Sequence, residues 1–91
     1  MARIAIYTTS YCGYCWRALR LLEKKGLAFD KHDVTGDPAT RRWLIEKTGR
    51  HTVPQVFIDG RGIGGYTDLA ALDRSGELDR LLAAPPPEPL A

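Results

Sequence analysis

The chain has 91 residues, of which 44% are hydrophobic and 26% are charged, and its formal net charge is +2. These values are typical of one small soluble globular domain and exclude a disordered or fibrous chain. Basic residues are interspersed with acidic ones, which argues against nucleic acid as a partner. Apolar stretches fall far short of the roughly 20 residues that cross a bilayer, and the first residues lack a secretory pattern. We therefore expect a cytoplasmic protein without a membrane partner.

The first half of the chain alternates strand and helix patterns. Residues 3–8 are β-branched and alternating, which predicts a strand, and residues 15–26 place apolar side chains at helical spacing before a glycine stop. Residues 27–34 indicate a modest, partly exposed second strand. An aspartate cap, a proline at the first helical position and a glycine stop predict a second helix over roughly residues 38–48.

The second half predicts a hairpin and further helical structure. Residues 54–58 have a strand pattern, an aspartate-glycine pair is the strongest short hairpin-turn signal, and residues 62–64 form a short return strand. Thr67 or Asp68 is expected to cap a third helix. Ser75 begins a final short helix, and the pattern fits either a separate helix or one continuous with the third.

The element order is therefore β-α-β-α-β-β-α. A strand-helix-strand unit of about 30 residues implies two parallel strands joined by a right-handed crossover, and the later hairpin adds antiparallel strands. We expect an α/β fold in which a four-stranded mixed sheet is flanked by helices. One domain spans residues 1–83, and residues 84–91 form a flexible, proline-rich tail.

Two cysteines lie three positions apart, too few for a disulfide scaffold or a self-sufficient four-ligand zinc site. Cys12 is expected where the first strand turns into the first helix, and free backbone N–H groups there stabilise a thiolate. Cys15 faces back toward it at a separation that a disulfide can close. We interpret the pair as a nucleophile and its resolving thiol. The alternatives are two unrelated buried cysteines or half of a zinc site.

A second motif is Thr52-Val53-Pro54, in which a proline begins a strand. If the proline is cis, the chain turns sharply and exposes the Val53 backbone for strand-like pairing with an extended peptide. A trans proline that merely marks the strand start is an equally good interpretation of this motif alone.

A third motif runs from Gly64 to Asp68 ahead of a helix. Its glycines permit close backbone approach, its free N–H groups suit a carboxylate, and Asp68 suits a cationic amine. A zwitterionic α-amino acid head would fit there. Taken by itself, the segment is more often just a glycine turn and a helix cap.

In this order and spacing, the three motifs resemble the dithiol glutaredoxin family over about residues 3–82. The resemblance implies a thioredoxin-like fold and an enzyme, a glutathione-dependent oxidoreductase that reduces protein disulfides and glutathione-protein mixed disulfides through Cys12 and Cys15. It implies glutathione as reductant, disulfide-containing or glutathionylated proteins as partners, and a monomer. The positions that match the family's glutathione-binding residues are Tyr14, Arg41, Thr52, Val53, Pro54, Gly65, Thr67 and Asp68.

The resemblance also implies individual roles. Val53 pairs through its backbone with the cysteine of glutathione, beside a cis Pro54, and Tyr14 flanks the groove. Thr67 and Asp68 hold the γ-glutamyl head. Arg41 falls where the family often places a residue for the glycyl carboxylate, although Arg42 is adjacent.

Two departures from the family pattern affect these implications. Many members carry a lysine two or three residues before the first cysteine, where this chain has Thr8-Thr9-Ser10, so one partner of the thiolate and of glutathione is missing. Gly13 replaces the commoner proline and relaxes the motif. Such relaxed motifs resemble members that hold an iron-sulfur cluster between two protomers. The alternative function is therefore a cluster carrier, a glutathione-ligated homodimer in which Cys12 is the metal ligand; no other metal is expected.

A thioredoxin proper is a further rival. It would share the fold and the cysteine pair but would lack the head-group site between Gly64 and Asp68.

Overall fold

The computed structural model describes residues 3–10 and 12–83. The predicted tail, residues 84–91, lies outside these described residues. The elements, in chain order, are β1 (Ile4–Thr8), α1 (Gly13–Lys24), β2 (Asp30–Asp33), α2 (Pro38–Thr48), β3 (Gln55–Ile58), β4 (Arg61–Gly64), α3 (Tyr66–Ser75) and α4 (Glu77–Ala83).

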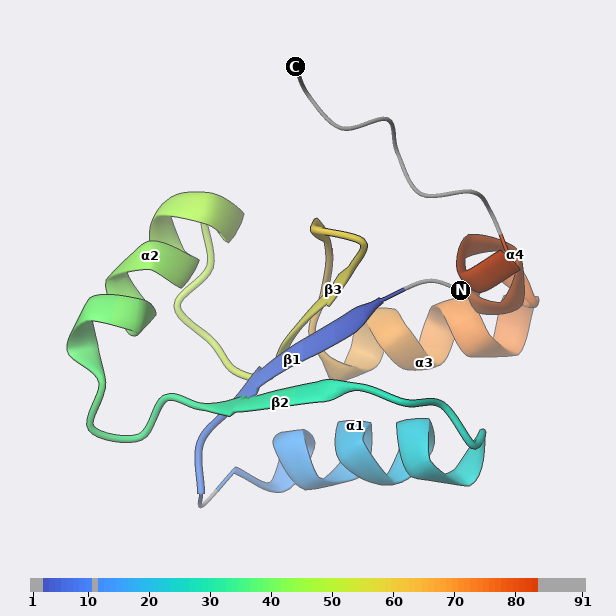
Figure 1. The fold of residues 1–91 in the computed structure, drawn as a ribbon, viewed down its shortest axis with the longest axis horizontal. Helices are drawn as coiled ribbons and strands as arrows, with labels where there is room; N and C mark the ends of the chain where they lie inside the picture. The colour runs from blue at the N-terminus through green and yellow to red at the C-terminus, as the bar shows by residue number, and fades with distance from the viewer. Residues whose placement is uncertain (1–2, 11, 84–91) are drawn as a thin grey trace.

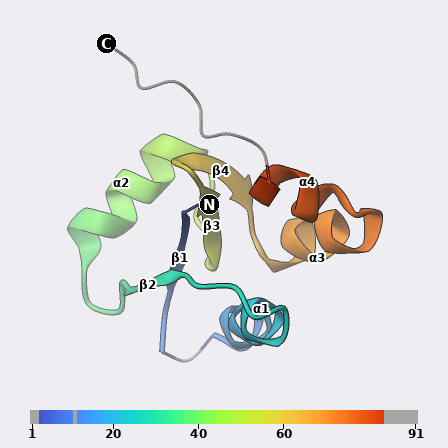
Figure 2. The same cartoon turned by 45° about the vertical axis from the view of Figure 1, so that its right-hand side comes forward.

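The strands form one sheet in the order β2-β1-β3-β4. β1 and β2 are parallel, whereas β3 is antiparallel to both β1 and β4. Figures 1 and 2 show α2 on one side of the sheet and α1, α3 and α4 on the other. The predicted four-stranded mixed sheet flanked by helices is confirmed.

Alternation along β1 sends its side chains to both faces of the sheet. Ile4 and Ile6 belong to the main core with Leu22 of α1 and Leu69 of α3. On the opposite face, Val34, Leu44 and Phe57 form a smaller cluster against which Ala5 and Tyr7 pack. All four residues of β3 are buried, because this central strand has helices over both faces.

Local turn chemistry fixes α2 and the hairpin. The Asp37 side chain accepts a hydrogen bond from the Thr40 N–H at 3.2 Å, and Gly49 closes the helix with a φ of 72°. In the hairpin, Asp59 has a φ of 52° and Gly60 one of 79°, as a two-residue type I′ turn requires. The predictions for both segments are confirmed.

The start of α3 differs from the prediction. The cap is Gly65, not Thr67 or Asp68. Asp68 acts from the third helical position, where its carboxylate accepts a hydrogen bond from the Gly65 N–H at 3.0 Å. A glycine cap has no side-chain signal of its own, so the sequence pattern placed the helix start too late.

Three other boundaries shift. Helix α4 begins at Glu77 rather than at Ser75, and it is not continuous with α3, because Gly76 closes α3 with a φ of 82°. Helix α1 ends at Lys24, two residues before the predicted glycine stop at Gly26. Strand β2 is confined to Asp30–Asp33 at the exposed edge of the sheet. None of the helices in the described part of the chain is long and apolar enough to span a membrane.

Candidate active site

Cys12 lies at the junction of β1 and α1, as predicted. It is the N-cap of α1, with extended backbone angles, and its Sγ accepts a hydrogen bond from the Cys15 N–H at 3.2 Å. The sulfur therefore pairs with an N–H group of the first turn, at the positive end of the helix macrodipole. The predicted thiolate character of Cys12 stays a prediction.

Cys15 lies one turn into α1 and differs from Cys12 in its surroundings. Its side chain is buried, with 2% of its surface exposed, whereas Cys12 is partly exposed. Burial, followed by the hydrogen bond with Cys12, raises the pKa of the Cys15 thiol to about 12. Cys15 is thus a protonated, enclosed thiol near neutral pH, and Cys12 is the thiol that a substrate can reach.

The Val53 backbone lies directly beside Cys12. The peptide bond between Val53 and Pro54 is cis, as the family resemblance implied. The Cys12 thiol donates to the Val53 carbonyl at 3.4 Å. Cys12 and Val53 are 41 residues apart in the sequence. They meet because the antiparallel pairing of β1 with β3 places the end of β1 beside the start of β3.

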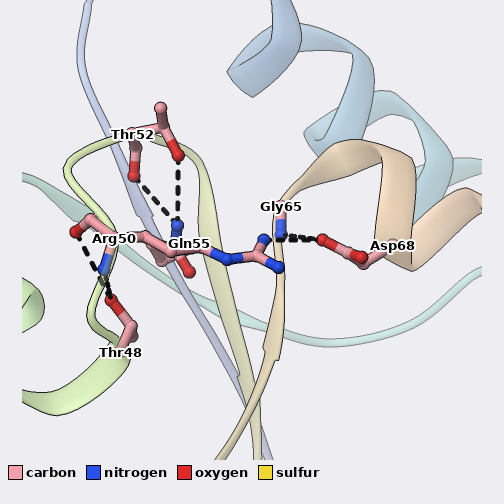
Figure 3. Close-up of polar contacts among 6 residues, drawn as sticks. All are labelled: Thr48, Arg50, Thr52, Gln55, Gly65 and Asp68. Carbon is pink, nitrogen blue, oxygen red and sulfur yellow. Dashed lines mark hydrogen bonds and ion pairs between the residues drawn. The ribbon is translucent and has the colours of Figure 1, made fainter.

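Asp68 is held at the start of α3 by two hydrogen bonds to one oxygen (Figure 3). Its Oδ2 accepts from the Gly65 N–H at 3.0 Å and from Arg50 Nη1 at 2.9 Å. The Arg50 guanidinium, and then the Gly65 N–H, lower the pKa of the Asp68 carboxyl below its ordinary value. Gly64 has a φ of 111°, and a Cβ there would overlap the Asp68 carboxylate. This position therefore requires glycine.

Two hollows flank the Val53 backbone. The smaller, of about 250 Å³, is lined by Tyr14, Arg50, Thr52, Val53, Pro54, Gly65, Tyr66, Thr67 and Asp68. The larger, of about 620 Å³, is lined by Thr9, Val34, Thr35, Gly36, Asp37, Pro38, Arg41, Arg42, Ile45 and Val53. The structure thus brings seven of the eight predicted binding residues to the smaller hollow and places Arg41 in the larger one, with Val53 shared by both.

The larger hollow is the basic end of the site. Arg41 donates through Nη2 to the His51 carbonyl at 3.0 Å, which ties α2 to the loop before Val53. Arg42 lines the same hollow, so the choice between the two arginines stays open. Thr9 also lines this hollow, and it belongs to the segment before Cys12 in which many family members carry a lysine. In this chain, the cations that line the hollow are Arg41 and Arg42 of α2.

Sequence reasoning missed two residues of the smaller hollow. Arg50 lies two residues before the Thr52-Val53-Pro54 motif and was not predicted as a site residue, yet its guanidinium reaches the Asp68 carboxylate at 2.9 Å. Tyr66 forms a wall with Tyr14, and their ring centroids are 6.3 Å apart. Both residues lie next to or within a recognised motif, and that proximity was the available signal.

A reachable thiol at a helix start, with a second thiol one turn behind it, is the arrangement typical of thioredoxin-like thiol-disulfide oxidoreductases. The family model for glutaredoxin matches residues 4–63 of the chain. The chain belongs to the glutaredoxin family. This finding confirms the resemblance drawn from the three motifs.

Curated relatives agree along most of the chain. Glutaredoxin 3 of Escherichia coli strain K12 is 50% identical over 82 residues, which cover 90% of this chain and 99% of the relative. A glutaredoxin of Pseudomonas aeruginosa is 46% identical over 84 residues, covering 92% of this chain and 100% of the relative.

Solved structures agree with the fold. The buckwheat glutaredoxin-glutathione complex has a TM-score of 0.84 at 31% identity, covering 89% of this chain and 76% of that chain. A Brucella melitensis glutaredoxin has a TM-score of 0.81 at 44% identity, covering 90% of this chain and 89% of that chain. The predicted thioredoxin-like fold is confirmed.

Proposed function

We propose that this chain reduces glutathione-protein mixed disulfides and protein disulfides, with glutathione as the reductant. The observation that carries the proposal is the position of Cys12 Sγ, 3.4 Å from the Val53 carbonyl. Val53 lines both hollows, one of which holds the Arg50–Asp68 pair and the other Arg41 and Arg42. A zwitterionic tripeptide with a central thiol is complementary to this arrangement. The buckwheat relative, whose structure is a glutathione complex, supports the same ligand.

Charge sets the direction in which glutathione would bind. The γ-glutamyl head would lie in the smaller hollow, with its ammonium near the Asp68 carboxylate and its α-carboxylate near the first N–H groups of α3. The glycyl carboxylate would lie in the larger hollow near Arg41 or Arg42. The cysteinyl residue would then pair with the Val53 backbone, which brings its sulfur to Cys12.

The first reaction is the reduction of a mixed disulfide. The Cys12 thiolate attacks the glutathione sulfur, a Cys12–glutathione disulfide forms, and the target sulfur leaves as a thiolate that takes up a proton. The thiolate of a second glutathione attacks the bound glutathione sulfur. This step releases oxidised glutathione and restores the Cys12 thiolate.

Reduction of a protein disulfide uses both cysteines. Cys12 first forms a mixed disulfide with the target and releases one target thiol. Cys15 then attacks the Cys12 sulfur and expels the second target thiolate. Because the pKa of Cys15 is raised to about 12, Cys15 must lose its proton as it attacks, and the departing thiolate can accept that proton. Two glutathione molecules reduce the resulting Cys12–Cys15 disulfide.

The first step can be tested by intact-mass measurement. Cys15→Ser protein mixed with a glutathionylated peptide should gain one glutathionyl group on Cys12 while the peptide thiol is released. Cys12→Ser, the matched control, should gain none. Peptide, rather than glutathione, attached to Cys12 would contradict the proposed binding direction.

The iron-sulfur alternative stays a prediction. Within residues 3–10 and 12–83, no three His, Cys, Asp or Glu side chains gather closely enough to hold a metal ion. A cluster would therefore need Cys12 from two protomers together with two glutathione thiols. Cluster absorption in a dimer purified without oxygen would support this function, and a colourless monomer would contradict it. A monomeric state and a cytoplasmic location are likewise our proposals from the sequence.

A further inference from the structure

Arg50 is fixed at both ends. Its backbone N–H donates to Thr48 Oγ1 at 3.1 Å, and that hydroxyl also donates to the Leu44 carbonyl of α2 at 2.7 Å. Its side chain extends from this loop to the start of α3, where Nη1 meets Asp68 Oδ2 at 2.9 Å (Figure 3). A long side chain anchored in this way forms one wall of the smaller hollow.

The pairing leaves one side of the Asp68 carboxylate open. Both of its hydrogen bonds to other described residues, from Gly65 and from Arg50, go to Oδ2. A carboxylate accepts at both oxygens, and a guanidinium has five N–H donors. A ligand ammonium can therefore bind Asp68 at Oδ1 while Arg50 stays on Oδ2 and offers its remaining donors to a ligand carboxylate.

We propose that Arg50 determines specificity for the head group, binding the γ-glutamyl α-carboxylate while Asp68 binds the α-ammonium. This assignment rests on the proposed function. Arg50 and Asp68 lie side by side, so a zwitterionic head can place its carboxylate against the cation and its ammonium against the anion. This orientation makes two favourable charge pairs. A head that carries only one charge makes one such pair and leaves the other protein charge without a ligand partner.

Two other roles of Arg50 predict different changes in ligand affinity when its side chain is removed. If Arg50 merely competed with the ligand ammonium for Asp68, removing it would tighten binding. If Arg50 only tied the loop to α3, removing it would weaken every ligand equally. These alternatives make the proposal testable by combining variants with ligand analogues.

The experiment measures kcat and KM for peptides carrying glutathione in disulfide linkage. Two analogues accompany it, one with 4-aminobutyryl in place of γ-glutamyl, which lacks the α-carboxylate, and one with glutaryl, which lacks the amine. Arg50→Gln should raise KM for the glutathione substrate about tenfold with kcat nearly unchanged. It should raise KM similarly for the glutaryl substrate but leave KM for the 4-aminobutyryl substrate unchanged. Arg50→Lys should recover part of the loss.

Arg61→Gln is the matched control, because it removes the same charge from exposed β4 and should behave as the wild type. An unchanged or lowered KM for the glutathione substrate in Arg50→Gln would overturn the assignment. So would an equal rise with the 4-aminobutyryl substrate, which would make Arg50 a structural tie. A wild type with no glutathione-dependent turnover would instead overturn the proposed function, and the assignment with it.

Discussion

Two cysteines three positions apart have different chemistry because their surroundings differ. Cys12 lies at the start of a helix and is partly exposed, whereas Cys15 is 2% exposed and its pKa is raised to about 12. The strand pattern before the pair and the helix pattern after it predicted which thiol would be at the helix start. The burial of Cys15 depends on α1 packing against the sheet, so the size of the difference could be seen only in the fold.

This difference predicts selective alkylation. Because a raised pKa keeps Cys15 protonated until the pH approaches about 12, iodoacetamide near neutral pH should modify Cys12 and spare Cys15. The rates can be compared by mass spectrometry of two variants that each keep one cysteine. The thiol left in Cys12→Ser should react roughly a hundredfold more slowly than the thiol left in Cys15→Ser. Equal rates would contradict the assigned roles. Denatured protein is the control, in which both thiols should react.

Asp68 predicts a specific dependence on pH. Arg50 and Gly65 lower its pKa, so its charge, and the stability that its pairing adds, are fully present above the ordinary aspartate range and are lost as pH falls through the lowered pKa. Between about pH 5 and 8, Asp68→Asn should therefore raise KM for a glutathionylated peptide by a constant factor of about ten. A KM difference that varied across this range would contradict the assigned ionisation.

At the scale of elements, predictions succeeded where a side chain acts on nearby backbone. The start and end of α2 follow from Asp37, Pro38 and Gly49, all of which signal locally. The start of α3 was predicted too late because Gly65 caps it without a side chain and Asp68 acts from within the helix. The same carboxylate that stabilises this helix start also faces the proposed ligand.

Substitution of Gly64 tests whether the Gly64–Asp68 turn supports both the stability of the fold and binding at the site. Gly64→Ala would place a Cβ against the Asp68 carboxylate at a φ of 111°. It should lower the free energy of unfolding in urea by about 1–3 kcal/mol and also raise KM for glutathionylated peptide. Gly13→Ala is the matched control, since a Cβ there meets no atom within 4 Å. Equal stability of the two variants would contradict this account.

At the scale of the whole molecule, the sheet order assembles the site. Antiparallel pairing of β1 with β3 brings Cys12 and Val53 together, and packing of α3 on α1 adds the Gly64–Asp68 turn. The element order predicted a parallel strand pair and an antiparallel hairpin, whereas the three motifs were assigned to one site through their resemblance to the glutaredoxin family. The Arg50–Asp68 pair could not be predicted, because it depends on how far one side chain reaches across that site.

The main core stabilises this fold, and Leu22 is one of its buried residues. Leu22 is fully buried between α1 and the sheet, with 0% of its surface exposed. Leu22→Ala should lower the free energy of unfolding by about 2–5 kcal/mol, measured by urea denaturation. Lys24→Ala, exposed on the same helix, should change it by less than about 0.5 kcal/mol. A loss at Leu22 no larger than that at Lys24 would contradict the described core.

The central claim is that Cys12, with glutathione, is sufficient to reduce mixed disulfides and that Cys15 is needed only to resolve protein disulfides. NADPH consumption, coupled through glutathione and glutathione reductase to a glutathionylated peptide, tests it most directly. The wild type and Cys15→Ser should both turn over, and Cys12→Ser should not. No glutathione-dependent turnover by the wild type, or equal loss of activity in both variants, would contradict the account.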